Sequence, residues 1–432
     1  MNKQKVNIIT LGCSKNLVDS EYLLHKLKNA GFDVYHDSNE TDFDYVLINT
    51  CGFIGDAKEE SIEMILNYAE EKQNGNIKKL IVFGCLSQRY SKELINEIPE
   101  ADAFFGAYDQ NNILKYLNLK PDKTNNRFLT TPQHFAYLKL SEGCDRTCSF
   151  CAIPLIKGKY KSRNIDDVIK EATLLAKQNV KELILIAQDL TYYGIDLYKK
   201  PVINKIVNEL SLIDGIEWIR LHYTYPVNFP ESLIDEIASN DKVCKYLDIP
   251  VQHISDNILK RMRRNITKKE TIKLLEKIKN KIPDISLRTT LMVGFPGESS
   301  NDFNELKEFV KDFQFDRLGV FQYSHEEDTY AYLNYKDDIP ESIKCARHNE
   351  IMKIQEKISF NKNTNRIGNT YKVLVDRKEG DYFIGRTQYD SPEVDNEVII
   401  KANSVKTGEF YNVIITDAEA YDLFGVVKEN NF

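Results

Sequence analysis

The sequence predicts an α/β multidomain protein: a doubly wound parallel α/β domain, then a partial (β/α) barrel, then a small antiparallel β-barrel at the C-terminus. Three observations predict this fold class. Strand-like apolar runs alternate with amphipathic helical runs in residues 1–126, the same alternation returns in residues 131–366, and residues 367–432 hold only short β-type runs. Alternating strands and helices are typical of parallel sheets, whereas short strands divided by turns are typical of small barrels.

The first domain is predicted from three apolar runs that have the length of strands. They are Val6–Leu11, Asp44–Asn49 and Lys79–Gly84. Apolar residues recur at helical spacing in Asn16–Ala30 and again after Asp56. Strands that are apolar throughout are typical of a parallel sheet with helices on both faces. The polar run Lys120–Asn126 then predicts the connection to the next domain.

The second domain is predicted from six further strand candidates with helical runs between them. These are Phe135–Leu140, Glu182–Ala187, Glu217–His222, Tyr246–Val251, Ser286–Val293 and Arg317–Tyr323. A long charged helix at about Glu341–Arg366 closes the domain. Six parallel strands indicate an incomplete (β/α) barrel, in which functional groups lie at the C-terminal ends of the strands.

The third domain begins near Thr370, where five short β-type runs follow one another. They read TYKVLVDRK, DYFIGRTQYD, NEVIIK, FYNVIITDA and YDLFGVVK. This pattern predicts a small barrel with an oligonucleotide-binding-like outline.

Composition excludes several classes of protein. The 432 residues are 42% hydrophobic and 28% charged, with a net charge of −7, which excludes a disordered chain and disfavours a general nucleic-acid-coating protein. No apolar run approaches the roughly 18–20 residues that span a bilayer, and the N-terminus lacks a signal-peptide pattern. We therefore expect a cytoplasmic protein without membrane contact. In that reducing compartment its eight cysteines predict thiols or metal ligands rather than disulfides.

Three cysteines, here called the loop triad, lie close together in the run SEGCDRTCSFC. They are Cys144, Cys148 and Cys151. A structural zinc site takes four ligands, whereas three thiolates on a four-iron cluster leave one iron open to an outside ligand. The triad follows the first predicted barrel strand, where barrel chemistry occurs. The spacing therefore predicts an iron–sulfur site and disfavours three unrelated thiols.

Three other cysteines, here called the strand-end triad, each follow a predicted strand of the first domain. They are Cys13, Cys51 and Cys85, in ITLGC, LINTC and IVFGC. The carboxyl edge of an open α/β sheet is where ligands bind, so these thiols are expected to converge on a second cluster. The alternative is three core cysteines at strand ends, since cysteine is often buried. Cys244 and Cys345 receive no role.

The two triads in this order resemble the methylthiotransferases of the radical S-adenosylmethionine (SAM) superfamily. The resemblance covers the whole chain. It implies a methylthiotransferase domain at 1–126, a radical-SAM barrel at 131–366 and a substrate-recognising TRAM domain at 367–432. It further implies that the loop triad holds the 4Fe-4S cluster that binds and cleaves SAM. The strand-end triad would hold an auxiliary 4Fe-4S cluster that carries the sulfur.

The resemblance also implies SAM contacts, more loosely. The segment Leu291–Glu298 resembles the one that backs the adenine in this superfamily. Several residues lie at predicted strand ends or beside the loop triad, and the alternative for each is a structural role at the barrel rim. The expected contacts are Phe150, Gln188, Asp189, Arg220, Gln252, Gly294 and Glu298.

Several stretches resemble the branch of the family that modifies an aspartate of small-subunit ribosomal protein S-twelve. They include LGCSKNLVDSE, INTCGFI, YLKLSEGCDRTCSFCAIPLIKGKYKSR, LILIAQDLTYYG, YLDIPVQHISD, FQYSHEEDT and DSPEVDNEV. This implies insertion of a methylthio group at the β-carbon, with one SAM as radical source and a second as methyl donor. An electron donor and a sulfur source are then further partners. The alternatives are a transfer-RNA adenosine methylthiotransferase and, more remotely, a non-catalytic iron–sulfur carrier, a redox sensor or a nucleic-acid adaptor.

Charge supplies a separate argument about the partner. From Thr364 onward the chain has eight basic and twelve acidic residues, most densely acidic at Asp390–Glu397. A barrel that grips RNA is expected to be basic, so an acidic face favours a basic protein partner, with a solvated loop as the alternative. The run Lys260–Arg264, with Lys268 and Lys269, has the opposite sign. We expect a solvated helix face there rather than RNA contact.

Overall fold

The computed structural model describes residues 3–40, 42–120, 126–402 and 404–428. The chain forms two compact units. Unit 1 comprises Met1–Thr131, Tyr137–Arg146 and Cys151–Leu174, and unit 2 comprises Pro132–Ala136, Thr147–Phe150 and Leu175–Phe432. Residues 121–125 of the expected polar connector lie outside the described residues. Over the part of the chain that the structure describes, no helix is both long and apolar enough to cross a membrane.

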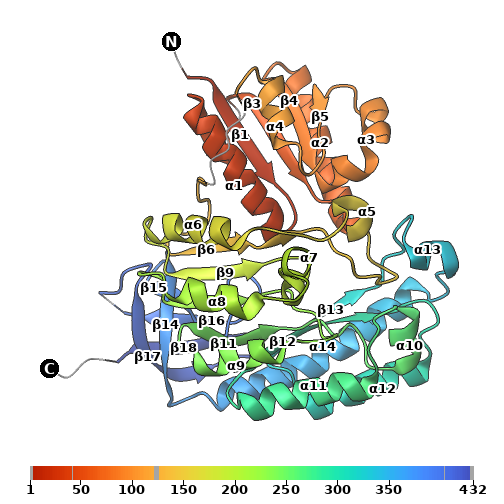
Figure 1. The fold of residues 1–432 in the computed structure, drawn as a ribbon, viewed down its shortest axis with the longest axis vertical. Coiled ribbons are helices and arrows are strands. Elements are labelled where there is room, and N and C mark those ends of the chain that lie inside the picture. The colour runs from red at the N-terminus through yellow and green to blue at the C-terminus, as the bar shows by residue number, and fades with distance from the viewer. Residues whose placement is uncertain (1–2, 41, 121–125, 403, 429–432) are drawn as a thin grey trace. The chain divides into compact units, whose positions relative to one another are not determined.

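Unit 1 is built on a five-stranded parallel sheet in the order β2–β1–β3–β4–β5. Strands β1, β3, β4 and β5 are labelled in Figure 1. Its strands are β1 (Lys5–Thr10), β2 (Asp33–His36), β3 (Phe43–Thr50), β4 (Ile77–Gly84) and β5 (Ala103–Phe104). The three strands expected from the sequence are thus confirmed as β1, β3 and β4. The two edge strands are additional; their residues are only partly buried, so they lack the apolar run that marks a central strand.

Alternate residues of the central strands enter two separate cores. Ile9, Ile48 and Val82 lie in one core, and Ile8, Leu47 and Ile81 in the other. Side chains alternate across a strand, so the two cores occupy opposite faces of the sheet, which is the expected doubly wound arrangement. The helices of this region are α1 (Ser14–Asn29), α2 (Gly55–Gln73), α3 (Cys85–Glu97) and α4 (Gln110–Tyr116).

Unit 1 also contains the segments on either side of the loop triad. These include β7 (Ser141–Glu142), α5 (Ile153–Lys157), β8 (Lys161–Ser162) and most of α6 (Ile165–Ala176). Strand β7 pairs with β8 in antiparallel register, Ser141 opposite Ser162. This short ribbon returns the chain to the start of the cysteine loop.

The second sheet has six strands in the order β13–β12–β11–β10–β9–β6, so spatial order follows chain order. All of them except β10 are labelled in Figure 1. The strands are β6 (Phe135–Lys139), β9 (Glu182–Ile186), β10 (Trp218–Leu221), β11 (Val243–Asp248), β12 (Ser286–Val293) and β13 (Arg317–Gln322). Neighbouring strands from β9 to β13 are parallel. All six strands were expected, and a sheet wound in one direction is that of an incomplete (β/α) barrel.

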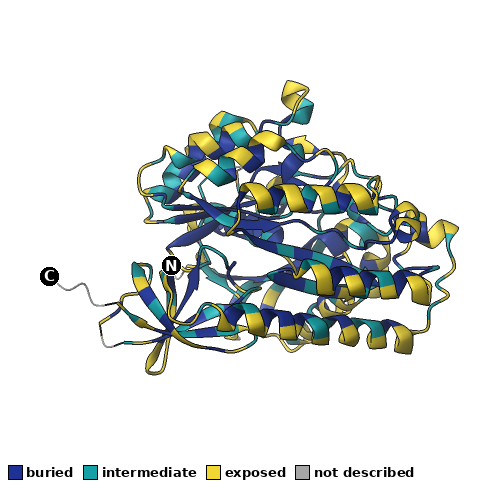
Figure 2. Cartoon of the chain, turned by 90° about the horizontal axis from the view of Figure 1, so that it is seen from below, coloured by how far each residue is buried: buried dark blue, intermediate teal, exposed yellow. Residues whose placement is uncertain are grey.

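The helices of unit 2 lie between and after its strands. Most of them bury one face, as the alternation of buried and exposed residues shows (Figure 2), whereas the short helix Ile195–Tyr198 has no buried residue. Two of them begin with a capping box, Thr267 with Glu270 and Ser299 with Asp302, which satisfies the free N–H groups of the first turn. The helices are η1 (Leu190–Tyr192), α7 (Ile195–Tyr198), α8 (Ile203–Ser211), α9 (Glu231–Ser239), α10 (Asp256–Arg261), α11 (Lys268–Lys281), α12 (Ser300–Phe313), α13 (Tyr330–Asn334) and α14 (Glu341–Thr364).

The C-terminal strands close into a barrel in the order β14–β15–β16–β18–β17. They are β14 (Thr370–Glu379), β15 (Tyr382–Thr387), β16 (Glu397–Lys401), β17 (Phe410–Ala418) and β18 (Asp422–Val427). Every neighbouring pair is antiparallel except β16 with β18, which is parallel. Apolar side chains such as Val373, Val398 and Val413 are fully buried in its core.

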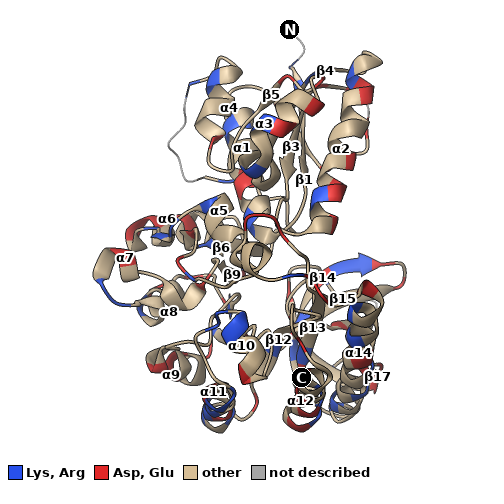
Figure 3. Ribbon diagram, turned by 90° about the vertical axis from the view of Figure 1, so that its right-hand side faces the viewer, with Lys and Arg blue, Asp and Glu red and all other residues tan. Residues whose placement is uncertain are grey.

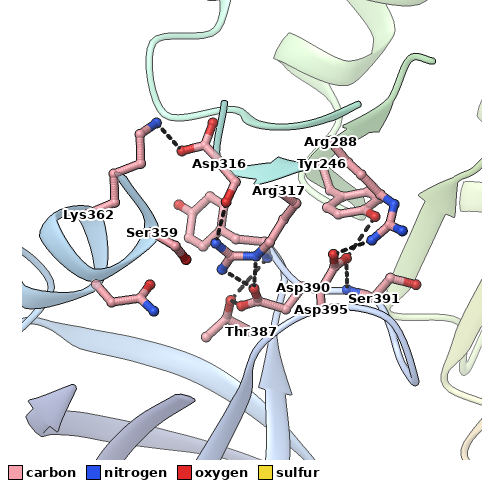
Figure 4. Close-up of polar contacts among 12 residues, drawn as sticks. Tyr246, Arg288, Asp316, Arg317, Ser359, Lys362, Thr387, Asp390, Ser391 and Asp395 are labelled. Atoms are coloured by element: carbon pink, nitrogen blue, oxygen red, sulfur yellow. Dashed lines mark hydrogen bonds and ion pairs between the residues drawn. The ribbon is translucent and has the colours of Figure 1, made fainter. Parts of the chain in front are cut away.

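The segment between β15 and β16 is buried against the sheet of unit 2 by ion pairs (Figure 4). Asp390 contacts the guanidinium of Arg317, and Asp395 contacts Arg288 at 2.6 Å. Both carboxylate side chains are fully buried. The expectation of an acidic face at Asp390–Glu397 is therefore wrong for its two aspartates, because each compensates an arginine of the sheet instead of facing solvent.

A second set of buried charges joins the barrel to strands β9 and β10. Glu182 contacts Arg220 and Arg386, each at 2.7 Å, and Arg386 also contacts Asp376 at 2.7 Å. Asp376 in turn lies 2.7 Å from the ring of His134. Burial opposes the ionisation of Glu182, but the two arginines outweigh it and hold its pKa below the usual range. These buried ion pairs thus connect the barrel to the sheet.

Candidate active site

The strand-end triad lies at one edge of the sheet in unit 1. Cys13 follows β1 and precedes α1, Cys51 follows β3, and Cys85 begins α3 directly after β4. These three strands are neighbours in the sheet, so their carboxyl ends meet at the same edge. At Gly12, which has a φ of +92°, a Cβ would lie 2.8 Å from the Cβ of Cys51. The turn after β1 therefore passes so close to the Cys51 side chain that only glycine fits at position 12.

Asn16 connects the three cysteine loops, and sequence reasoning missed it. Its side-chain amide donates to the carbonyls of Leu11 at 2.9 Å and Thr50 at 3.2 Å, while its oxygen accepts from the thiol of Cys85 at 3.7 Å. Ser61 holds the backbone of Cys51 in the same way, with both hydrogen bonds at 3.0 Å. The sequence feature that could have indicated this role is the polar side chain of Asn16 so close to Cys13 in LGCSKN.

The thiols of the strand-end triad differ in acidity. Burial raises the pKa of Cys51 and raises that of Cys85 to about 12. The protein around Cys13 also disfavours its thiolate, but the charge of Lys15 and the backbone N–H groups of Lys15 and Asn16 outweigh this and lower its pKa. A metal that binds here must displace protons from the two less acidic thiols.

The arrangement fits a cluster better than a single ion. A structural zinc site gathers four ligands around one ion, whereas a cluster spreads its thiolates over several irons. Three free thiols from three neighbouring loops match the second case.

Two members of the loop triad, Cys144 and Cys151, belong to unit 1. The N–H of Cys144 donates to the carbonyl of Gly158 at 3.1 Å, which fixes the start of the loop. Directly after Cys151, Ala152 packs in one buried cluster with Ile156 and Cys85. One end of the loop triad is thus a single residue away from a contact with the strand-end triad.

The third member, Cys148, lies in unit 2 beside a buried cation. Its sulfur is 3.5 Å from the hydroxyl of Tyr225 and 3.3 Å from Nη1 of Arg264. Arg264 also donates to the carbonyl of Pro250 at 2.6 Å, and its guanidinium lies 4.3 Å from the centroid of the Tyr225 ring. The segment after Cys148 is fixed by Ser149, whose N–H donates to the carbonyl of Met262 at 3.0 Å.

Basic residues at the end of α10 are blue in Figure 3. The expectation of a solvated face there holds for Lys260 and Lys269, which are exposed, and is wrong for the arginines. Arg264 is buried beside Cys148, and Arg261 donates to the carbonyl of Pro296 at 2.9 Å while its guanidinium lies over the ring of Tyr335. Arg263 lies over the ring of Tyr330 at 4.4 Å. The run therefore braces the loops around Cys148, which sequence spacing does not reveal.

The residues of the expected adenine-backing segment form a tight turn after β12. Gly294 has a φ of +74°, and its N–H donates to the carboxylate of Glu298. Glu298 is buried and also lies 3.2 Å from Arg347 and 3.6 Å from His253. Its carboxylate therefore organises the turn. Only the Glu298 oxygen that faces His253 has no hydrogen-bond partner, so it is the only one left for the expected cofactor contact.

The remaining expected contacts occupy different settings. Phe150 packs edge-on against Phe295, with the ring centroids 6.5 Å apart. Gln252 has a φ of +70° and forms an isolated parallel β-bridge with Leu291. Gln188 is half-buried after β9. Asp189 is buried and accepts from the hydroxyl of Thr191 at 2.5 Å. Gln188 and Asp189 follow β9, Gln252 follows β11, and Phe150 lies in the loop between Cys148 and Cys151.

The cofactor contact expected at Arg220 is wrong. It was expected to reach the carboxylate or ribose of SAM from the end of β10, but its side chain is fully buried and contacts Glu182. Its Nη1 donates to the carbonyl of Gln388 at 2.8 Å. Its donors are committed to β9 and to the segment after β15, so we assign Arg220 a structural role.

Three sequence families match successive parts of the chain. They are the Uncharacterized protein family UPF0004 at residues 5–106, the Radical SAM superfamily at 138–310 and the TRAM domain at 367–427. The first range contains the strand-end triad and the second contains the loop triad.

Full-length relatives decide the family. The chain is 53% identical over 431 residues to the ribosomal protein uS12 methylthiotransferase RimO of Bacteroides fragilis, covering 99% of this chain and 100% of that one. The chain belongs to the RimO family of radical-SAM methylthiotransferases. It is also 53% identical to the RimO of Parabacteroides distasonis, with 99% and 100% covered, and 52% identical to that of Christiangramia forsetii, with 98% and 94% covered.

Solved structures share the fold of this RimO-family chain at low identity. The radical SAM methyltransferase TsrM from Kitasatospora setae, with tryptophan and a SAM analogue bound, has a TM-score of 0.55 and 13% identity, covering 74% of this chain and 73% of that one. The cobalamin-dependent SAM radical enzyme OxsB has a TM-score of 0.51 and 14% identity, covering 82% and 56%. At this identity the similarity concerns the fold alone.

Proposed function

We propose that this chain inserts a methylthio group at the β-carbon of an aspartate in ribosomal protein S-twelve (uS12). The loop triad holds a 4Fe-4S cluster that binds SAM, and the strand-end triad holds a second 4Fe-4S cluster. When bound, these groups supply the radical, the sulfur and the methyl group, while the protein binds, aligns and excludes water. The identity of 52–53% to RimO proteins over nearly the whole chain supports the choice of substrate.

One observation carries the two-cluster proposal: Ala152 packs on Cys85 within unit 1. Consecutive Cα atoms are about 3.8 Å apart, so Cys151 begins one peptide away from that contact. One site generates the radical and the other supplies the sulfur to the same substrate carbon, so the two sites must lie near each other. A carrier or redox sensor has no such requirement, and it needs no partial barrel.

The chain's own residues have separate tasks around these sites. Arg264 and Tyr225 hold the sulfur of Cys148 between a cation and a hydroxyl. Asn16 fixes the turns that present the strand-end triad. Phe150 and the turn at Gly294 are the apolar and backbone surfaces that we assign to SAM, together with Gln188, Asp189 and Gln252.

Substrate recognition is assigned to the C-terminal barrel, within the division 1–126, 131–366 and 367–432. The burial of Asp390 and Asp395 removes these two carboxylates from the charge argument for a basic partner. The ribosomal substrate places the reaction in the cytoplasm, where a low-potential electron donor and a sulfur source are the further partners.

A paired turnover assay tests the proposal. Anaerobically reconstituted protein is given SAM, sulfide and a strong reductant with either purified uS12 or unmodified transfer RNA, and both are analysed by mass spectrometry. A methylthio gain on one aspartate of uS12 alone is the expected result. A gain on transfer RNA alone, or formation of 5′-deoxyadenosine with neither substrate changed, would overturn the substrate assignment.

A further inference from the structure

A groove with a volume of about 370 Å³ lies at the amino edge of the unit 1 sheet, where α2 meets the first residues of β3 and β4. Four of its lining residues are apolar or aromatic, and they are Phe43, Met64, Tyr68 and Ile77. Three others are acidic, and they are Glu40, Glu70 and Glu71. None of the described residues that line the groove is basic.

The acids of this groove keep their negative charge uncompensated. Three lysines at this edge of the sheet are each committed to another carboxylate, in the pairs Lys5–Asp42, Lys72–Asp102 and Lys78–Asp44. Within the part of the chain that the structure describes, no ion pair involves the three acids of the groove. The groove therefore combines an apolar lining with a free negative charge.

The negative surface continues along α2, where acidic residues are red in Figure 3. The helix contains six acids and two lysines, and each of its exposed charged residues is acidic. Ile62 and Leu66 share its outward face and are 37% and 50% exposed. Near the start of the helix, the Ser61 hydroxyl makes both hydrogen bonds to the backbone of Cys51. The outward face of α2 therefore runs from the strand-end triad to the groove.

Charge and shape together indicate the occupant. An apolar lining with acids beside it suits the aliphatic stem and cationic head of lysine or arginine. A ribosomal protein has to neutralise RNA phosphates, which requires lysine and arginine on its surface. The surface along α2 therefore attracts a protein of this kind and repels RNA itself.

We propose that the groove and the outward face of α2 bind a basic segment of uS12. This inference rests on the proposed function, because it takes uS12 as the substrate. The eight residues of β3 separate the groove from Cys51, and at roughly 3.3 Å per residue they span about 26 Å. The groove is thus a second contact for the substrate, remote from the chemistry, and it selects for a protein rather than a short peptide.

The test compares full-length proteins with reversed charges. Glu40→Lys combined with Glu70→Lys reverses two exposed acids of the groove. Glu70 lies in the last turn of α2, where the helix dipole favours a lysine, so the fold is preserved. The matched control combines Glu209→Lys with Glu276→Lys, two exposed acids on α8 and α11. The Kd for uS12 is measured at low and high salt, and the KM for uS12 and for SAM is measured with a chemical reductant.

We expect the groove variant to raise the Kd and the KM for uS12 roughly tenfold at low salt and less at high salt, because salt screens exposed charges. The KM for SAM should stay unchanged, and the control should match the parent. Glu40→Gln combined with Glu70→Gln should give a smaller rise, and it replaces the charge reversal if that variant does not fold.

Two results would overturn the inference. One is an equal Kd for uS12 in the groove variant and the parent. The other is a defect that arises only when a protein electron donor replaces the chemical reductant, since that would assign the groove to the donor. A parent that neither binds nor modifies uS12 would instead overturn the proposed function.

Discussion

The guanidinium of Arg264 lies 3.3 Å from the sulfur of Cys148, held there by the Pro250 carbonyl and the ring of Tyr225. This contact places a permanent cation beside one cysteine of the loop triad. We expect Arg264→Met to lower the iron occupancy at that triad. The yield of 5′-deoxyadenosine should fall at least tenfold. Lys269→Met, an exposed lysine nearby in sequence, is the control. Equal iron and equal yield in both variants would show that the cation is dispensable.

Cys148→Ala and Cys51→Ala should separate the two halves of the reaction. The first should abolish SAM cleavage, because the loop triad loses a ligand. The second should leave 5′-deoxyadenosine formation intact and stop methylthio insertion. Mass spectrometry of the substrate and chromatography of the nucleoside give both readouts. Product formation by Cys51→Ala would contradict the assignment of the strand-end triad.

Gly12→Ala should damage the strand-end triad through sterics alone. The added Cβ meets Cys51 at 2.8 Å, whereas at Gly31, with a φ of +97°, it meets nothing within 4 Å. Gly31→Ala therefore has the same unfavourable backbone region without the clash, and each variant should lose about 1 kcal/mol of unfolding free energy from the backbone. Only Gly12→Ala should lose iron from this triad. Equal iron loss in the two variants would refute the steric explanation.

Arg220→Met should destabilise the fold without a specific effect on SAM. It removes one of the two arginines that contact the fully buried Glu182. Loss of a sole partner typically costs about 3–5 kcal/mol, and since Arg386 remains we expect a smaller loss. Urea unfolding measures the loss, and the KM for SAM should stay within about twofold of the parent. A large rise in KM at unchanged stability would instead restore the cofactor role expected from sequence.

Acid should weaken unit 2 through Asp390. Burial opposes its ionisation, but Arg317 and Arg366 outweigh this and hold its pKa below the usual range of about 3.9. Since the folded pKa is the lower one, the stabilisation is complete at neutral pH and is lost as pH falls below about 4. Unfolding midpoints measured from pH 7 to pH 3 should fall less steeply in Asp390→Asn. An identical pH dependence in both proteins would rule out this group.

Most of the architecture was predictable from the sequence, because long apolar runs mark central strands. The six strands of the second sheet and the five of the barrel fall in their expected places. The edge strands β2 and β5 escaped, since short, half-exposed strands have no apolar signature. Cysteine spacing and strand-end position likewise indicated both triads, since each depends on local sequence and on parallel topology.

Side-chain roles within the site were less predictable. Arg220 stands near a strand end, yet its partner Glu182 is 38 residues away and starts the neighbouring strand. The aspartates of DSPEVDNE look solvated in sequence because their arginine partners lie on distant strands. Arg264 was expected to be solvated for the same reason: its contact with Cys148 arises only when tertiary packing supplies its neighbours.

The ion pairs between the C-terminal barrel and the sheet limit how the chain can be taken apart. Removing residues 367–432 would leave Arg220, Arg288 and Arg317 without the carbonyl and carboxylate groups that now meet them. Grafting a barrel from a different protein would do the same unless it carried matching acids at the same positions. The TRAM region is thus not an interchangeable appendage, and exchanges between relatives should succeed only when the sheet's arginines are transferred with it.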